Sequence, residues 1–440
     1  MSFIYLVKEK SMEYSNKQQT NLKYKFLKED NSNFLKLIHP PKTKNSLFYP
    51  LAHQSWNHEE HNAIINQLYS GKLTMGENVL KFEKQFADYF GSKFCVMVNS
   101  GSSANLLIVA ALTLLKKYNF KQGDEVLVPA LGWSTSYSPF NQYGIKLRFV
   151  DINKLTLNID EDQIEKAITE KTKAILAINI LGNPVEFKKI NEICKKYDLL
   201  LIEDNCESLG AKYDSKYTGT FGVASSHSFY FSHHLQTIEG GMISTDDKDI
   251  YEFCKSLRSH GWTRELDNKN EDDSKSEYIS KFKNSFKFVL PGYNVRPNEF
   301  NGILGQCQLK KFGKFLDERK RNANFFKNIF RKKSFCQIQE SSKDSSWYGF
   351  SIILSGNLRN KREYVINELI KEGIETRPIV SGNFLKNPVE KYYKYSVFND
   401  LKNIKDVDEN GFFVGNSHKD LKPQILRLFE ILDHLHKTIN

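Results

Sequence analysis

The chain has 440 residues, of which 40% are hydrophobic and 26% are charged, and its formal net charge is +11 at pH 7. This length and composition are typical of a globular protein with one large domain and one smaller domain. The apolar run at residues 3–7 is too short for a signal sequence, and no run approaches the roughly 18 apolar residues of a membrane span. We therefore expect a cytoplasmic protein that has no membrane partner.

The charge distribution and the cysteines argue against two further classes of protein. The lysines are spread along the chain, and no arginine-rich arm, zinc finger or aromatic RNA-reading motif accompanies them. We therefore attribute the positive charge to solvated helix faces and expect no nucleic-acid partner. The six cysteines contain no C-x-x-C pair, so the sequence predicts neither a disulfide framework nor a metal site.

Three regions follow one another along the chain. Residues 1–45 are polar and aperiodic, and they predict an N-terminal extension to which we assign no function. Residues 46–300 alternate helical segments with short apolar runs, a pattern typical of a large α/β domain with a mainly parallel sheet, and a polar surface loop is expected at 267–280. Residues 301–440 begin with a long helical pattern and predict a smaller C-terminal α/β domain. The expected strands are 94–98, 125–128, 147–151, 174–180, 199–203, 226–231 and 241–244.

The first motif that carries chemistry lies at 96–106. It combines an apolar strand, a turn of small residues that includes Gly101 and Ser102, and an apolar helix. Small residues let backbone N–H groups approach a phosphate, and the helix N-terminus adds a partial positive charge. A plain serine N-cap explains the same pattern equally well. The motif alone therefore leaves both interpretations open.

The second motif ends a buried strand with acidic residues. The apolar run at 199–202 leads directly into acidic side chains that include Asp204 and Glu207. At such a position a carboxylate can keep the nitrogen of a bound pyridine ring protonated, whereas the alternative is a solvated strand end. Trp133 follows another strand and a turn and is a candidate to stack on a bound ring, although a lone tryptophan is more often part of the core.

The third motif holds two adjacent histidines. Ser228 belongs to an apolar strand, and His233 and His234 follow it. Adjacent side chains on a strand point to opposite faces, so a zinc site that uses both histidines is disfavoured. No lysine lies between Lys216 and Lys248. Imidazole can move a proton, but it has no primary amine with which to form a covalent link to a carbonyl group.

Together, these motifs resemble the DegT-like sugar aminotransferases, a branch of the fold type I enzymes that use vitamin B6. The resemblance covers about residues 48–436 and implies an α/β fold of fold type I with pyridoxal 5'-phosphate (PLP) or pyridoxamine 5'-phosphate (PMP) as the cofactor. In this family a lysine normally holds the cofactor, and the flanking residues place His233 at its position. The resemblance therefore implies a cofactor that is not covalently bound.

The resemblance also implies roles for individual residues around the cofactor. The implied cofactor-binding residues are Gly101, Ser102 and Ser228 for the phosphate, Trp133 for the ring, Asp204 for the ring nitrogen and Glu207 for the ring hydroxyl. Asn294, within residues 290–297, would reach the phosphate bound by a neighbouring subunit. The resemblance therefore implies a homodimer with shared active sites.

Several longer sequence segments resemble a branch of the family whose members remove an oxygen from the sugar substrate. These segments lie at 73–77, 232–234, 260–264, 288–297 and 377–387. This likeness implies C3 deoxygenation of a GDP-linked 4-keto-6-deoxy sugar, most closely GDP-4-keto-6-deoxy-D-mannose, in dideoxysugar biosynthesis for surface polysaccharide. It also implies a PMP form of the cofactor that L-glutamate regenerates, with His233 as the general base. The implied substrate-binding residues are Glu77, His260 and Arg377, and for His260 an ordinary loop position is an equally good explanation.

Several alternatives remain open from the sequence. The same reaction on a GDP-linked 6-deoxy-4-keto heptose is compatible with these motifs. An ordinary sugar-nucleotide 4-aminotransferase would need a lysine elsewhere, and a non-catalytic regulator would keep the fold and bind the cofactor or the sugar as a signal. A related branch that carries an iron–sulfur cluster is disfavoured, because no cysteine lies between Cys254 and Cys307.

Overall fold

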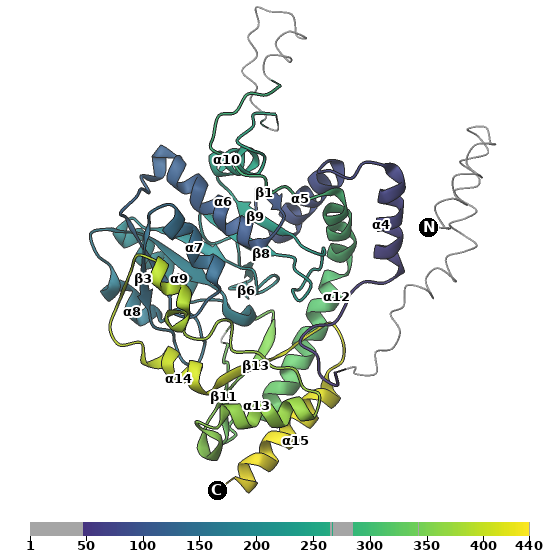
Figure 1. Cartoon of the computed structure of the whole chain (residues 1–440), viewed down its shortest axis with the longest axis vertical. Coiled ribbons are helices and arrows are strands. Elements are labelled where there is room, and N and C mark those ends of the chain that lie inside the picture. The colour runs from purple at the N-terminus through teal and green to yellow at the C-terminus, as the bar shows by residue number, and fades with distance from the viewer. Residues whose placement is uncertain (1–46, 265, 267–284, 342, 440) are drawn as a thin grey trace, which may run out of the picture. The chain divides into compact units, whose positions relative to one another are not determined.

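An eight-stranded, mostly parallel sheet organises the larger part of the chain (Figure 1). The computed structural model describes residues 47–264, 266, 285–341 and 343–439, so the predicted extension at 1–45 and the predicted loop at 267–280 lie outside the described residues. The strand order is β1-β9-β8-β5-β4-β2-β3-β12. Only β9 is antiparallel to its neighbours β1 and β8 within this described sheet, and the other pairs are parallel. The predicted α/β class with a mainly parallel sheet is confirmed.

Seven of the eight strands described in this sheet follow the predicted apolar runs, with one difference that concerns the site, and the edge strand β12 has no counterpart among those runs. The strands of the sheet are β1 (Phe94–Val98), β2 (Glu125–Pro129), β3 (Lys146–Val150), β4 (Thr172–Ile178), β5 (Leu200–Asp204), β8 (Ala224–Ser228), β9 (Gly241–Thr245) and β12 (Tyr395–Val397). The run predicted at 226–231 extends past the end of β8 at Ser228. Its last residues, Tyr230 and Phe231, are 46% and 45% exposed, because they line a cavity instead of joining the core.

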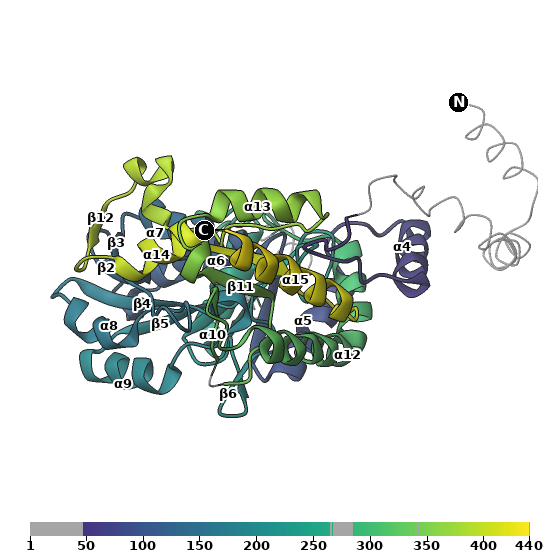
Figure 2. The ribbon, with the colours of Figure 1, turned by 90° about the horizontal axis from the view of Figure 1, so that it is seen from below.

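Alternate residues of the strands pack into separate cores on the two faces of the sheet. The helices on these faces are α6 (Gly101–Leu114), α7 (Ser134–Gln142), α8 (Glu161–Ala167), α9 (Phe187–Tyr197) and α10 (Lys248–Arg258). In β2, Val126 and Val128 pack with α6, α7 and α10, whereas Leu127 packs with α8 and α9. This period of two is that of a strand buried on both faces. Figure 2 shows α7 and α9 on opposite sides of the sheet.

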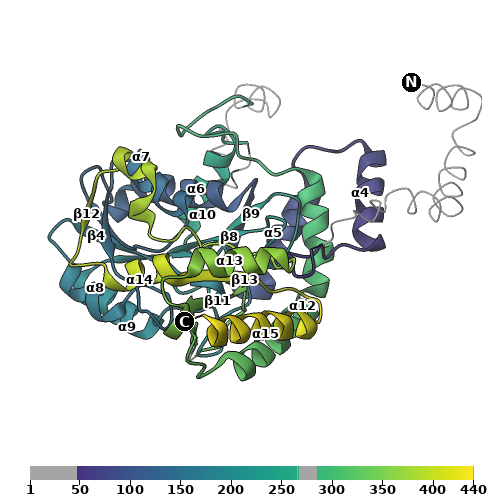
Figure 3. The same cartoon turned by 60° about the horizontal axis from the view of Figure 1, so that its bottom comes forward.

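A smaller antiparallel sheet with the strand order β10-β11-β13 forms what we call the C-terminal lobe, together with α13 and α15. Its elements are β10 (Cys336–Ile338), β11 (Gly349–Leu354), α13 (Arg362–Lys371), β13 (Gly411–Gly415) and α15 (Lys422–Thr438). Its core includes Phe350 of β11, Leu369 of α13 and Leu432 of α15. Figure 3 shows the two helices beside the small sheet. The domain boundary near residue 300 stays a prediction, and β12, which follows α13 in the chain, joins the edge of the large sheet.

The long helix α12 (Glu299–Phe330) connects the two sheets. It begins in a capping box, where the Asn298 side chain accepts a hydrogen bond from the Asn301 N–H at 3.1 Å. Midway along α12, Phe312 packs in one core with Phe82 of α5 (Glu77–Phe90), and near the end of α12 Phe326 packs in the core of the C-terminal lobe. The remaining α-helices and strands among the described residues are α4 (His58–Ser70), α14 (Lys402–Asn410), β6 (Lys212–Tyr213) and β7 (Lys216–Tyr217). Among the described helices, none combines the length and the apolar character that a membrane crossing requires.

Candidate active site

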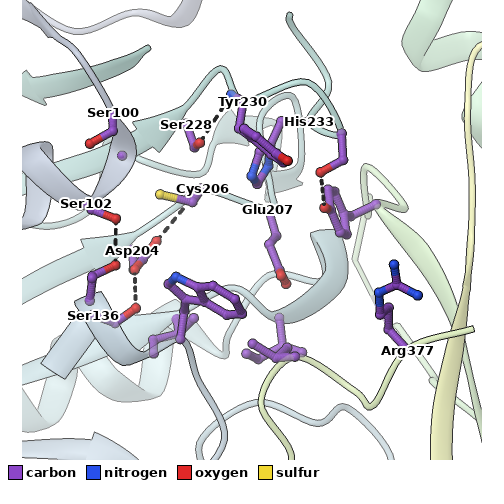
Figure 4. Close-up of a pocket in the computed structure, with 18 of the residues that line it drawn as sticks. Ser100, Ser102, Ser136, Asp204, Cys206, Glu207, Ser228, Tyr230, His233 and Arg377 are labelled. Atoms are coloured by element: carbon purple, nitrogen blue, oxygen red, sulfur yellow. Dashed lines mark hydrogen bonds between the residues drawn. The ribbon is translucent and has the colours of Figure 1, made fainter. Parts of the chain in front are cut away.

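A cavity of about 610 Å³ opens at the carboxyl ends of β5 and β8 and at the N-terminus of α6. This edge of a parallel sheet is the usual place for a ligand. Most of the predicted site residues line the cavity, and Figure 4 shows their side chains around a common space. The predicted residues that line it are Gly101, Ser102, Trp133, Asp204, Glu207, Ser228, His233 and Arg377.

The N-terminus of α6 forms one wall of this cavity. Ser100 is the N-cap, and its hydroxyl oxygen accepts a hydrogen bond from the Ser103 N–H at 3.1 Å. The Ser102 hydroxyl lies 2.7 Å from the Thr135 hydroxyl at the start of α7. The first N–H groups of a helix have no partner within the helix, so this wall favours an anion. The N-cap interpretation of the motif therefore applies to Ser100, and the phosphate interpretation stays a prediction for Gly101 and the part-buried Ser102.

Gly101 allows this wall to pack closely against the ends of β5 and β8. A Cβ at this position would lie 2.8 Å from both the Cys206 Sγ and the Ser228 Cβ. Gly101→Ala is therefore expected to lower the free energy of unfolding by about 1–3 kcal/mol and to weaken the binding of a phosphorylated cofactor. Urea unfolding of the cofactor-free protein and PLP titration measure the two effects.

Gly313 of α12 offers a matched control for this substitution. It is exposed, and the nearest heavy atom to a Cβ there is the Tyr89 hydroxyl oxygen at 3.8 Å. Gly313→Ala is expected to raise the free energy of unfolding by about 0.5–1 kcal/mol, because alanine is the better residue inside a helix. If Gly101→Ala were as stable as the unsubstituted chain, the close packing at the cavity wall would not restrict this residue.

Asp204 is buried at the end of β5 with its carboxylate held by hydrogen bonds. Its Oδ2 accepts from the Ser136 hydroxyl at 2.6 Å and from the Asn105 side-chain amide at 2.9 Å. Its Oδ1 accepts from the Cys206 N–H at 3.1 Å. These contacts fix the carboxylate in one orientation on the cavity wall, which suits it to pair with a cationic N–H group.

Trp133 and Glu207 contribute an aromatic surface and a second acid. Trp133 immediately precedes α7 and is 59% exposed, although it lines the cavity, so it offers a ring face that the core does not use. Glu207 accepts a hydrogen bond from the Leu181 N–H at 2.9 Å. Burial, reinforced by the nearby Asp204 carboxylate, raises the pKa of Glu207 to about 7. Glu207 can therefore hold a proton near neutral pH.

His233 lies in the loop after β8 and lines the cavity. Its backbone N–H donates to the Tyr230 carbonyl oxygen at 2.9 Å, and its ring centroid lies 5.1 Å from that of Tyr348. Burial, reinforced by the charge of Arg319, lowers the pKa of His233 to about 4. The imidazole is therefore neutral near pH 7, as a general base must be.

His234 points away from the cavity. It is buried and does not line the cavity, and its Nε2 lies 3.1 Å from the Ser346 carbonyl oxygen. Burial lowers its pKa well below the ordinary value. The two adjacent histidines thus have different surroundings, and the geometry favours His233 as the reactive residue.

Three predicted residues lie outside the cavity of this chain. Glu77 is exposed at the start of α5, with its carboxylate 3.8 Å from the Lys81 amine. His260 is exposed and has a φ of 65°. Asn294 is exposed, and its side-chain oxygen accepts a hydrogen bond from the Arg296 Nε at 3.1 Å. The role predicted for Asn294 involves a neighbouring subunit, and the roles of all three residues stay predictions.

The structure also brings residues to the site that the sequence did not single out. Ser136 and Asn105 orient the Asp204 carboxylate, and Tyr348 reaches the cavity from the C-terminal lobe. Asn105 had a detectable signal, because it is a polar residue within the apolar helix after Gly101. Tyr348 had none, since no motif surrounds it.

The matches to known proteins agree with this arrangement. The chain matches the model of the DegT/DnrJ/EryC1/StrS aminotransferase family over residues 54–415. It belongs to this family. The match confirms the family predicted from the motifs, and within the DegT/DnrJ/EryC1/StrS family several relatives resemble the chain over most of its length.

Three relatives illustrate this similarity. A GDP-4-keto-6-deoxy-D-mannose 3-dehydratase of Yersinia pseudotuberculosis is 50% identical over 385 residues, which cover 87% of this chain and 98% of that protein. The structure of the Escherichia coli enzyme of the same name with bound hydrated PLP is 48% identical with a TM-score of 0.84, over 88% of this chain and 99% of that chain. A structure of GDP-4-keto-6-deoxymannose-3-dehydratase with a trapped PLP-glutamate geminal diamine is also 48% identical with a TM-score of 0.84. That match covers 87% of this chain and 100% of the other chain. These likenesses confirm the predicted fold of the PLP-dependent aminotransferases.

Proposed function

We propose that this chain is a PLP- and PMP-dependent 3-dehydratase that removes the C3 oxygen of a GDP-linked 4-keto-6-deoxy sugar. The expected substrate is GDP-4-keto-6-deoxy-D-mannose, and L-glutamate is the amino donor that regenerates PMP. The observation that carries the proposal is the position of His233, which lines the cavity, whereas no lysine is among the described residues that line it. The amine that would tether PLP is therefore missing, and an imidazole takes its place.

The residues along the cavity fit a phosphorylated pyridine. The hydroxyls of Ser102 and Ser228 line the cavity beside the N-terminus of α6, which favours an anion, and Gly101 lets this helix pack closely against Ser228. Asp204 presents an oriented carboxylate, and Trp133 presents an aromatic face. We assign the phosphate to the serines and Gly101, the ring nitrogen to Asp204, and the ring face to Trp133.

The work of each residue follows from its position. Bound PMP supplies the amine and the electron sink that couple the loss of the C3 oxygen to the release of ammonia. Asp204 would keep the ring nitrogen protonated, and Glu207, which can hold a proton near pH 7, would bind the ring hydroxyl. Neutral His233 removes a proton at its imidazole nitrogen as the general base.

The pKa of His233 predicts how kcat/KM falls in acid. A general base is active when it is unprotonated, so its contribution is present above its pKa and is lost below it. Because the pKa of His233 is lowered to about 4, kcat/KM, which reports the free enzyme, should hold down to about pH 5 and then fall about tenfold per pH unit below pH 4. A pH series of kcat/KM checks this. An acid limb at the ordinary histidine value of 6.5 would contradict the effect of burial.

The assignment of substrate and amino donor rests on the relatives. The Yersinia relative is named for GDP-4-keto-6-deoxy-D-mannose, and one solved relative holds PLP together with glutamate. Arg377 lines the cavity, and its Nη2 lies 2.7 Å from the Glu375 Oε1. Figure 4 shows Arg377 across the cavity from Ser102. We therefore propose that Arg377 binds an anionic group of the substrate or of glutamate.

The remaining assignments concern parts of the site that this chain does not bring to the cavity. Glu77 and His260 are our candidates for contacts to the sugar nucleotide. Asn294 is the candidate for a phosphate contact across a homodimer with shared active sites. We place the enzyme in the cytoplasm, in dideoxysugar biosynthesis for surface polysaccharide.

A panel of substrates tests the proposal. The enzyme is incubated with PLP, L-glutamate and 4-keto-6-deoxy sugars linked to GDP, CDP or dTDP, together with a GDP-linked heptose analogue, and mass spectrometry records the products. We expect the fastest turnover with GDP-4-keto-6-deoxy-D-mannose and a product that has lost one oxygen. An amino sugar as the main product would identify a 4-aminotransferase, and binding without turnover would identify a regulator. Either result would refute the proposal.

A further inference from the structure

One short segment of the C-terminal lobe contacts the histidine loop at successive residues. The Tyr348 hydroxyl lies 2.8 Å from the Ser232 hydroxyl, and the Tyr348 ring is 5.1 Å from the His233 ring, at an angle of 36°. The Ser346 carbonyl oxygen lies 3.1 Å from the His234 Nε2. The loop that carries the proposed base is therefore attached to a segment that is remote in the sequence.

The segment at 346–348 is held firmly by buried polar contacts. The Arg319 Nη1 donates to the Tyr348 carbonyl oxygen at 3.2 Å and to the Trp347 carbonyl oxygen at 3.4 Å. The Asn416 side-chain amide donates to the same Trp347 oxygen at 2.8 Å. Arg319 is buried, so its hydrogen bonds to carbonyl groups are worth more than they would be in water. The segment has little freedom to move relative to α12.

Two residues at the contact between the 346–348 segment and the cavity wall have a strained backbone conformation. Trp347 and Leu181 have φ values of 50° and 51°, a region that is unfavourable for residues other than glycine. The Leu181 carbonyl oxygen accepts a hydrogen bond from the Tyr348 N–H at 2.9 Å, and the Leu181 N–H donates to Glu207. Surrounding contacts must maintain such strain, and strained residues cluster at functional sites.

The His233 imidazole is held by one backbone contact, and its Nδ1 makes none. The Cys206 backbone forms a hydrogen bond with the imidazole, whereas the Nδ1 is buried and has no hydrogen-bond partner in the described part of the chain. No hydrogen bond at Nδ1 therefore helps to orient the ring. The Tyr230 ring lies farther away than the Tyr348 ring, with a centroid separation of 6.3 Å. The aromatic side chain that lies closest against the imidazole is therefore Tyr348.

We propose that Tyr348 is a positioning residue for His233. Its ring orients the imidazole in the cavity, and its hydroxyl, through Ser232, holds the loop from which the imidazole projects. The proposal rests on the function proposed for His233. Arg319 acts on His233 indirectly, because it fixes the backbone of Tyr348.

Loss of the ring changes the solvation of His233 and leaves the charges around it in place. The ionisable groups near the imidazole are Asp204 of β5, Glu207, Arg319 of α12, Tyr230 and His234 of the same loop, and Tyr348. Burial is the main cause of the lowered pKa of His233, so water admitted by a smaller side chain at position 348 should raise that pKa toward 6.5.

The test compares Tyr348→Leu and Tyr348→Phe with a control in the same lobe. Phe350→Leu also removes a fully buried ring, which stacks on Phe326 at 4.5 Å. The measurements are the 15N NMR titration of the His233 imidazole in the cofactor-free full chain and the pH profile of kcat/KM. The NMR titration does not depend on turnover, so it distinguishes failure of this inference from failure of the proposed reaction.

We expect Tyr348→Leu to raise the His233 pKa by at least about one unit and to lower kcat at pH 7 by about tenfold to a hundredfold. Tyr348→Phe keeps the ring and should retain the low pKa, with a loss of kcat of about tenfold or less. Phe350→Leu should lower the stability without moving either titration. An unchanged His233 titration in Tyr348→Leu, or the same shift in Phe350→Leu, would overturn the proposal.

Discussion

Replacing His233 with lysine is expected to attach PLP covalently to the chain and to abolish most of the dehydration. The lysine restores a primary amine at a position that lines the cavity, and it removes the neutral imidazole that serves as the base. The C3 deoxygenation rate should fall by about 10²–10⁴-fold. Intact-mass measurement after borohydride reduction and denaturation should detect the cofactor on His233→Lys and should not detect it on the unsubstituted chain.

A second substitution separates the two effects of this change. His233→Gln removes the base without supplying an amine, so it should lose activity to a similar extent and remain free of covalently bound cofactor after reduction. If reduction fixed PLP to the unsubstituted chain, another residue would supply the amine, and the central role of His233 would be wrong.

Asp204→Asn is expected to have the second largest effect. Asparagine has nearly the same size and can still accept the hydrogen bond from the Ser136 hydroxyl, but it lacks the negative charge that we assign to the ring nitrogen. The expected loss in kcat is about 10²–10³-fold, because a preorganised charge is removed from a buried site. Steady-state kinetics and PLP titration should show that turnover falls more than cofactor affinity.

Ser136→Ala is the matched control for this prediction. It removes one hydrogen bond to the Asp204 carboxylate and leaves the charge and the Asn105 contact in place. We expect a loss in kcat of about tenfold, as for a single hydrogen bond to a charged group. Equal losses in Asp204→Asn and Ser136→Ala would show that orientation, and not charge, is what Asp204 contributes.

The parts of the fold that the sequence predicts are those that local patterns control. β2 has apolar residues on both faces, so the run at 125–128 was recognisable as a buried strand. The turn before α6 was recognisable because small residues follow a strand and precede an apolar helix. The missing lysine was visible for the same reason, since the residues around His233 follow the pattern of the family.

The parts that the sequence did not predict depend on long-range packing. The apolar run that contains β8 continues through Tyr230 and Phe231, and only the fold reveals that these residues line a cavity. The sequence leaves Trp133 open between a core residue and a ring-stacking residue, and only the fold shows that it lines the cavity and is more than half exposed. Tyr348 meets His233 because α12 and the small sheet bring distant segments together, and no local pattern encodes that contact.

The fate of the glutamate nitrogen tests the central claim most directly. The enzyme is supplied with PLP, 15N-labelled L-glutamate and GDP-4-keto-6-deoxy-D-mannose, and the label is followed by mass spectrometry in both the sugar and the released ammonia. Our account predicts that the label leaves as ammonia, in an amount equal to the sugar that has lost its C3 oxygen. Label retained in a sugar that keeps its C3 oxygen would contradict it and would identify an aminotransferase.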